Sequence, residues 1–266
     1  SEKGDITVYR LMLSYLLPLI GWRMEEMGKF SLEWNELKTI LNLALSSIQE
    51  NKFAEEVGLR PKDWRLLVDR LKIFDRPPNY AYDILSDFLT KHLQLLVIET
   101  EEDNLTVHQT EQAQYVFLHQ DFRDFFAARY VLFEIDKSIS KEIMPEALCE
   151  NLMPKKLRCY LGEIIGLHNN LVNNEKGEIE KEEKNSLSEL FDLCRIDNEN
   201  TVLTDEKAVR ATTWNILNIY SDFNKDLSTI DLSNLNLRDV PIGRFILSSH
   251  IGKEYSSPNF YGTILS

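Results

Sequence analysis

The sequence predicts a mainly α-helical protein that contains one small β-sheet. The chain has 266 residues, and apolar residues recur at helical spacing through most of the segment before residue 95. Glycine and proline are scarce, at 10 and 8 residues, which disfavours a sheet-rich fold with many tight turns. The apolar period changes to that of strands between residues 95 and 119, and it returns to helical spacing afterwards.

Helices are expected along the whole segment before residue 94. Gly28 suits the position that follows a helix, Ser31 could cap the start of the next one, and Pro61 fits a first helical turn. The expected helices are Tyr9–Met27, one that carries the apolar residues Leu37–Ile48, one that opens at Pro61, and Tyr82–Leu93.

Short strands are expected next, at Leu95–Glu99, Leu105–His108 and Tyr115–His119, with a polar turn at 101–104. Helices followed by a small hairpin-like sheet are typical of a winged-helix lobe. A further helix should open at Gln120 or Asp121.

Aromatic residues mark one face of that helix, at spacings that predict a wide apolar stripe. We expect the rings of Phe122, Phe125, Phe126 and Tyr130 to lie in the core and the polar residues to form the more polar face of the helix. The stripe comprises Phe122, Phe125, Phe126, Tyr130 and Phe133, and the polar face comprises Arg123, Asp124 and Arg129.

The second half of the chain should also be helical, within Pro145–Gly166, Ser186–Leu193 and Asp205–Tyr220. Apolar and polar residues then alternate in LSTIDLSNLNLRDVPIGR, which resembles the start of a pentapeptide or leucine-rich repeat. The expected domains are a winged-helix lobe at 1–137, a helical connecting domain at 138–225 with a charged linker near 173–185, and a repeat region at 226–266.

The composition argues against several classes of partner. A net charge of −13 disfavours nucleic acid and anionic membrane. The apolar run Leu11–Trp22 is too short to span a bilayer, so no membrane partner is expected. The 3 cysteines include no C-x-x-C pair, which favours the reducing cytoplasm over a disulfide framework or a zinc site.

The sequence carries no complete catalytic motif. No P-loop, dinucleotide-binding, zinc-protease, nucleophile-elbow or EF-hand pattern occurs, and the 5 histidines lack metal-ligand spacing. We therefore expect no catalytic residue, no metal site and no bound cofactor in this chain, which would not itself be an enzyme.

One segment resembles a known family. YVFLHQDFRDFFAARYV is similar to the end of the winged-helix lobe in NACHT-type switch ATPases, which belong to the STAND class and include NOD-like receptors. The matching positions are Phe117-Leu118, His119, Phe122, Arg123-Asp124, Phe125-Phe126 and Ala127-Ala128. The opening segment LMLSYLLPLIGWRMEEMGKFS also resembles the first helix of that lobe in bacterial members.

The resemblance implies a role for His119 as a sensor of the β-phosphate of ADP. A histidine at a strand end, just before a helix N-terminus, can donate an N–H to an anion in a locally positive field. Phe117, Phe122, Phe125, Phe126 and Tyr130 would fix the helix and thereby His119.

The resemblance also implies a longer parent protein. A nucleotide-binding core would precede residue 1 and use ADP or ATP with magnesium. The C-terminal repeats would bind a protein ligand, and the activated protein would oligomerise. The chain would then be a regulatory and sensing part of a signalling ATPase, with bacterial defence against phage as the setting.

Two other functions remain open from the residues alone. The chain could be an interaction scaffold that needs no nucleotide. It could also be a winged-helix regulator that binds DNA, although Asp63 and Asp69 offset its best basic cluster of Arg60, Lys62, Arg65 and Arg70.

Overall fold

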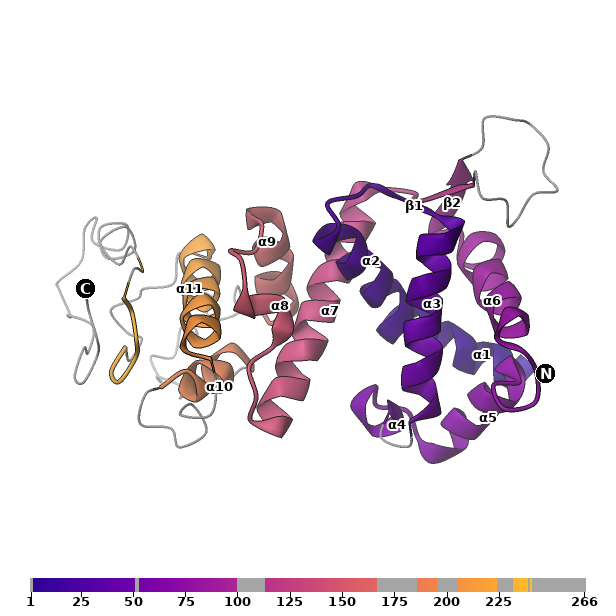
Figure 1. Cartoon of the computed structure of the whole chain (residues 1–266), viewed down its shortest axis with the longest axis horizontal. Helices are drawn as coiled ribbons and strands as arrows, with labels where there is room; N and C mark the ends of the chain where they lie inside the picture. The colour runs from indigo at the N-terminus through magenta and orange to yellow at the C-terminus, as the bar shows by residue number, and fades with distance from the viewer. Residues whose placement is uncertain are drawn as a thin grey trace, which may run out of the picture. The chain divides into compact units, whose positions relative to one another are not determined.

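A computed structural model describes residues 2–50, 53–99, 113–166, 186–195, 205–223, 232–238 and 240 (Figure 1). Over these residues the protein is mainly helical, with a three-stranded antiparallel sheet. The chain divides into two compact units, Ser1–Tyr130 (unit 1) and Val131–Ser266 (unit 2). The predicted fold class is thus confirmed at the level of a helical protein with one small sheet.

Unit 1 contains the sheet and most of the helices expected before it. Its first helical segment is continuous from Glu2 and passes through one π-helical turn, so it begins earlier than expected. The elements are α1 (Glu2–Leu11), η1 (Met12–Leu16), α2 (Leu17–Glu26), β1 (Ser31–Glu33), α3 (Trp34–Gln49), α4 (Phe53–Glu56), α5 (Pro61–Leu71), α6 (Pro78–Asp87), η2 (Phe88–His92), β2 (Leu96–Glu99), β3 (Gln114–Phe117) and the first half of α7 (Gln120–Lys141).

Gly28 ends α2 as expected. Its φ of +64° lets the chain reverse, so that the Gly28 N–H donates to the Glu25 carbonyl and the Lys29 N–H to the Met24 carbonyl. These two bonds form a Schellman motif, which satisfies carbonyls that the helix end would otherwise leave unpaired.

The expectation that Ser31 caps the next helix is wrong. Ser31 opens β1, because its backbone pairs with Val116 of β3. The cap of α3 is Glu33, which forms a capping box with Glu36. A strand of three residues is too short to show an alternation of apolar and polar side chains, so the sequence does not predict β1.

The sheet has the order β1-β3-β2, and both pairs are antiparallel. Tyr115 lies at its centre, opposite Leu32 of β1 and Ile98 of β2. The Tyr115 side chain is fully buried, and this burial raises its pKa to about 12. Of the expected strands, the first and last are confirmed, while Leu105–His108 and the turn at 101–104 lie outside the described residues.

Unit 2 is built around α11 (Glu206–Asp222), which packs against α8 (Glu146–Cys149), α9 (Lys155–Ile164) and α10 (Ser186–Leu193). These helices confirm the expected ones, and Asp205 caps α11 by accepting a hydrogen bond from the Lys207 N–H. Among the described parts of the repeat-like segment, Leu235 forms an isolated β-bridge with Arg195.

The boundaries expected at 137 and 225 stay predictions, as does the repeat assignment. The two units divide after Tyr130, within α7, seven residues before the first expected boundary. The expected linker at 173–185 and most of 226–266 lie outside the described residues. Within the described ranges, no helix has both the length and the apolar character needed to cross a bilayer.

Candidate regulatory site at the junction of β3 and α7

His119 lies in a short junction between the sheet and a long helix. Strand β3 ends at Phe117 and α7 begins at Gln120, so only Leu118 and His119 connect them. The Leu118 N–H donates to the Leu95 carbonyl at 2.9 Å, and the Phe122 N–H donates to the His119 carbonyl at 3.0 Å. The junction is therefore hydrogen-bonded at both ends.

The His119 side chain is exposed, with the Phe122 ring nearly perpendicular to it at a centroid distance of 6.0 Å. Leu118 is also exposed, at 54%. An exposed imidazole beside the first turn of a 22-residue helix can donate a hydrogen bond to an approaching anion.

The aromatic stripe is only partly buried. Phe117 and Phe126 lie in the core with ring centroids 6.1 Å apart, and Phe125 packs edge-on against Phe126 at 5.4 Å. Tyr130 is half-buried and stacks on Trp22 at 6.1 Å. These four rings hold α7 against the rest of unit 1.

The expectation that Phe122 lies in the core is wrong, because its side chain is 37% exposed. Residues of α7 that lie against α2 include Arg123, Phe126, Ala127 and Tyr130, which share one face at helical spacing. Phe122 precedes Arg123 by one residue, and successive residues on a helix differ by about 100° in direction. It therefore lies at the edge of that face, in the first turn of α7 and one turn before Phe126, and stays partly exposed.

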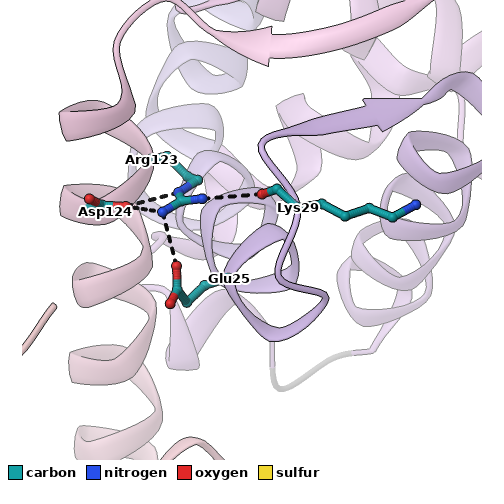
Figure 2. A network of polar contacts seen from close by, with 4 residues as sticks. All are labelled: Glu25, Lys29, Arg123 and Asp124. Carbon is teal, nitrogen blue, oxygen red and sulfur yellow. Dashed lines mark hydrogen bonds and ion pairs between the residues drawn. The ribbon is translucent and has the colours of Figure 1, made fainter. Parts of the chain in front are cut away.

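The expected polar face is also wrong for Arg123 and Asp124, which are both buried, whereas Arg129 is exposed as expected. Figure 2 shows the Arg123 guanidinium between Asp124, Glu25 and the Lys29 carbonyl. Its Nε and Nη2 donate to Asp124 Oδ1 at 2.9 and 2.6 Å, and its Nη1 donates to the Lys29 carbonyl at 3.2 Å. Nη2 also lies 3.1 Å from Glu25 Oε2.

We call this group, Arg123 with Asp124, Glu25 and the Lys29 carbonyl, the arginine clamp. It joins α7 to two points of the α2 end, because Glu25 belongs to α2 and Lys29 follows the Schellman turn. The Lys29 side chain extends away and pairs with Glu36, so only its backbone takes part (Figure 2). The guanidinium also lies 4.7 Å from the centroid of the Phe30 ring.

Gly21 explains how the helices come close enough for the clamp to form. A Cβ at this position would lie 2.8 Å from the Arg123 carbonyl oxygen and 2.9 Å from the Ala127 nitrogen. Only glycine permits this approach of the α2 and α7 backbones. Glycine at position 21 thus permits the close contact between α2 and α7, and this contact places Arg123 beside Glu25.

Burial makes the arginine clamp sensitive to the loss of any member. The Arg123 side chain is 8% exposed and that of Asp124 6%, while Glu25 retains 22%. Removing one partner of a buried ion pair leaves an uncompensated charge and is strongly destabilising. The sequence did not predict the arginine clamp, because an Arg-Asp pair on a helix usually lies on a solvated face. Gly21 within an apolar run was the available signal of a close helix contact.

No family model, no curated protein and no solved structure matches the chain. Within the described part of the chain, no cluster of three or more histidine, cysteine or acidic side chains could hold a metal ion.

Proposed function

We propose that the chain is the regulatory and sensing part of a NACHT-type signalling ATPase, with His119 as the sensor of a nucleotide phosphate. Residues 1–137 would form its winged-helix lobe and 226–266 the start of a ligand-binding repeat region. The nucleotide-binding core would stand before residue 1, and the whole protein would act in the cytoplasm.

The observation that carries the proposal is the geometry of His119. Its imidazole is exposed, while the junction that bears it is hydrogen-bonded at both ends. A sensor needs both properties, since the ring must reach a ligand and must have a fixed position when the ligand arrives. A structural histidine in the core would instead be buried.

The surroundings of His119 also support contact with another protein surface. Leu118 and Phe122 are exposed on either side of it, at 54% and 37%. Large exposed apolar side chains at one place favour burial against a partner. In the proposal the partner is the nucleotide-binding core, with the ADP phosphate at the His119 ring.

The proposed mechanism is a closed state held by ADP. His119 donates an N–H to the β-phosphate, and this bond ties the lobe to the core through the nucleotide. Binding of a protein ligand to the repeats would then separate the lobe from the core, allow ADP to exchange for ATP and permit oligomerisation. A hydrogen bond to a charged group contributes about 1.5–3 kcal/mol.

The test is His119→Leu in the full-length protein, with ADP retention measured by quantifying nucleotide after purification and by the rate of ADP release. We expect ADP release to become about ten- to a hundredfold faster, because one charge-assisted hydrogen bond is lost. His92→Leu is the matched control, since His92 is an exposed histidine of the same unit.

Unchanged ADP retention and signalling in His119→Leu would reject the sensor role. The 266-residue chain alone offers a second arm. It should bind neither ADP nor ATP in calorimetry, and tight binding would contradict the assignment of the nucleotide site to a preceding core.

A further inference from the structure

The first turn of α7 is held on α2 in two different ways. The backbone contact at Gly21 sets how closely the helices approach. The arginine clamp adds directed bonds from Arg123 to Glu25 and to the Lys29 carbonyl, at 3.1 and 3.2 Å. Contacts of these two kinds restrict different motions of the helix.

A close backbone contact is nondirectional, so by itself it limits distance more than rotation. A guanidinium is planar and presents its N–H groups in fixed directions. A rotation of α7 about its axis would therefore move the N–H groups of Arg123 out of line with the Glu25 carboxylate and the Lys29 carbonyl. Asp124 accepts from Nε and Nη2 at once and thereby fixes the plane of the guanidinium.

We infer that Arg123 is the positioning residue for His119: the arginine clamp fixes the rotation of the first turn of α7, and this rotation aims the imidazole. The inference deepens the proposed function, on which its biological meaning rests. The physical link itself is independent of any nucleotide.

The link runs through few atoms. Arg123 follows Phe122, whose N–H donates to the His119 carbonyl and whose ring contacts the His119 ring. On the other side, Leu118 is held to Leu95, and strand β3 is paired with both β1 and β2. Because the sheet restrains β3, a rotation of α7 should change the backbone most at His119.

The experiment uses the 266-residue chain with isotope-labelled histidines and no nucleotide. The His119 signal is identified by its loss in His119→Gln. Its chemical shift and the exchange rate of the Phe122 amide are then measured in Arg123→Met, Arg123→Lys and Glu25→Gln.

We expect the His119 signal to move in all three variants and the Phe122 amide to exchange faster. The acceleration should be largest in Arg123→Met, at about tenfold, which corresponds to about 1.4 kcal/mol. In Arg123→Lys the exchange rate of the Phe122 amide should lie between the rates in Arg123→Met and in the natural protein, because lysine keeps the charge but lacks the planar guanidinium. Glu25→Gln removes a charge from the arginine clamp at nearly constant shape. It therefore tests the inference even if Arg123→Met fails to fold.

Arg158→Met in unit 2 is the control for a buried arginine in general. The side chain of Arg158 is 9% exposed and pairs with Asp222 at 2.6 Å, but it has no part in the junction. Equal movement of the His119 signal in this control, or no movement in folded Arg123→Lys and Glu25→Gln, would overturn the inference. Failure of the proposed function is seen separately, as unchanged ADP retention in full-length His119→Leu.

Discussion

Among the residues that the structure describes, units 1 and 2 each bury one arginine, and the two side chains make similar first contacts. Arg123 donates from Nε to Asp124 at 2.9 Å, and Arg158 donates from Nε to Asp222 at 2.6 Å. Each also donates from Nη1 to a backbone carbonyl, that of Lys29 in unit 1 and that of Met153 in unit 2. Arg123 thus connects α7 to the end of α2, and Arg158 connects α9 to the end of α11.

The two sites differ in the group that completes them. In unit 1 a second carboxylate, Glu25, shares the guanidinium. In unit 2 the neutral amide of Asn215 completes the site: its Oδ1 accepts the Met153 N–H, and its Nδ2 donates to the carbonyls of Leu148 and Asn151. Within the described part of the chain, the unit 2 site pairs one cation with one carboxylate, whereas the arginine clamp pairs one cation with two.

This difference shows how two buried polar sites can have different consequences. A balanced pair supported by an amide satisfies backbone groups and holds one packing arrangement. Loss of a cation that two carboxylates share removes the same favourable interaction from both of them, here Asp124 and Glu25, at once. The unit with the exposed histidine therefore carries the more vulnerable site.

The largest expected effect comes from replacing the two arginines. Arg123→Met should destabilise unit 1 by about 4 kcal/mol, and Arg158→Met should destabilise unit 2 by about 3 kcal/mol, since the first removes a buried cation from two carboxylates and the second from one. Native-state hydrogen exchange read by mass spectrometry measures each unit separately. A larger loss for Arg158→Met would contradict the comparison.

The next effect concerns two helix contacts made by glycine. A Cβ at Gly21 would meet backbone atoms of α7 at 2.8 and 2.9 Å, whereas the atom nearest to a Cβ at Gly162 would lie in the ring of Phe223, at 2.1 Å. Backbone cannot move without separating the helices, but a ring can rotate. Gly21→Ala should cost about 3 kcal/mol, and Gly162→Ala about 1 kcal/mol or less, because alanine also favours the helix.

The same hydrogen-exchange measurement decides between these two substitutions. We expect Gly162→Ala to lose less stability than Gly21→Ala, although its Cβ would make the shorter contact. If Gly162→Ala proves as costly as Gly21→Ala, the Phe223 ring is as fixed as a backbone, and the contrast between the two units is lost.

The smallest effect is a difference in alkaline stability. Burial raises the pKa of Cys194 in unit 2 from 9.0 to about 12, and that of Tyr115 in unit 1 from 10.0 to about 12. As pH rises past the unfolded pKa, the unfolded state releases a proton that the folded state retains, so stability falls. Unit 2 should lose stability from about pH 9 and unit 1 from about pH 10, and at pH 10 the Cys194 loss is about 1.4 kcal/mol.

Pulse proteolysis in urea at pH 8 and pH 10, with fragments assigned to each unit, measures this difference. Burial raises the pKa of Cys149 as well, so it adds to the unit 2 loss in the same direction. Cys194→Ala should reduce the pH dependence of unit 2 and leave that of unit 1 unchanged. If unit 2 of Cys194→Ala loses as much stability between pH 8 and pH 10 as unit 2 of the natural chain, Cys194 is not the source of this pH dependence.

Much of the fold could be predicted from the sequence, because its helices carry local signals. Pro61 and Asp205 mark helix starts, and Gly28 marks a helix end with a φ of +64°. The capping of α3 could not be assigned correctly, because the competing strand β1 forms only when β3 lies beside it.

The candidate site could be predicted in part. The place of His119 between a strand and a helix followed from the change in apolar period, and the structure places it there. Which face of α7 is buried did not follow, since the aromatic stripe suggested Phe122 inside and Arg123 outside. The structure reverses these two residues.

The sequence by itself determined the helical class, the strand-to-helix junction at His119 and the end of α2 at Gly28, because each depends on residues close together in the chain. Only the tertiary structure decided the rotation of α7 and the burial of Arg123. Arg123 becomes a better core residue than Phe122 once Gly21, Glu25 and the Lys29 carbonyl stand beside it. Those partners lie about a hundred residues away, so no local pattern could reveal them.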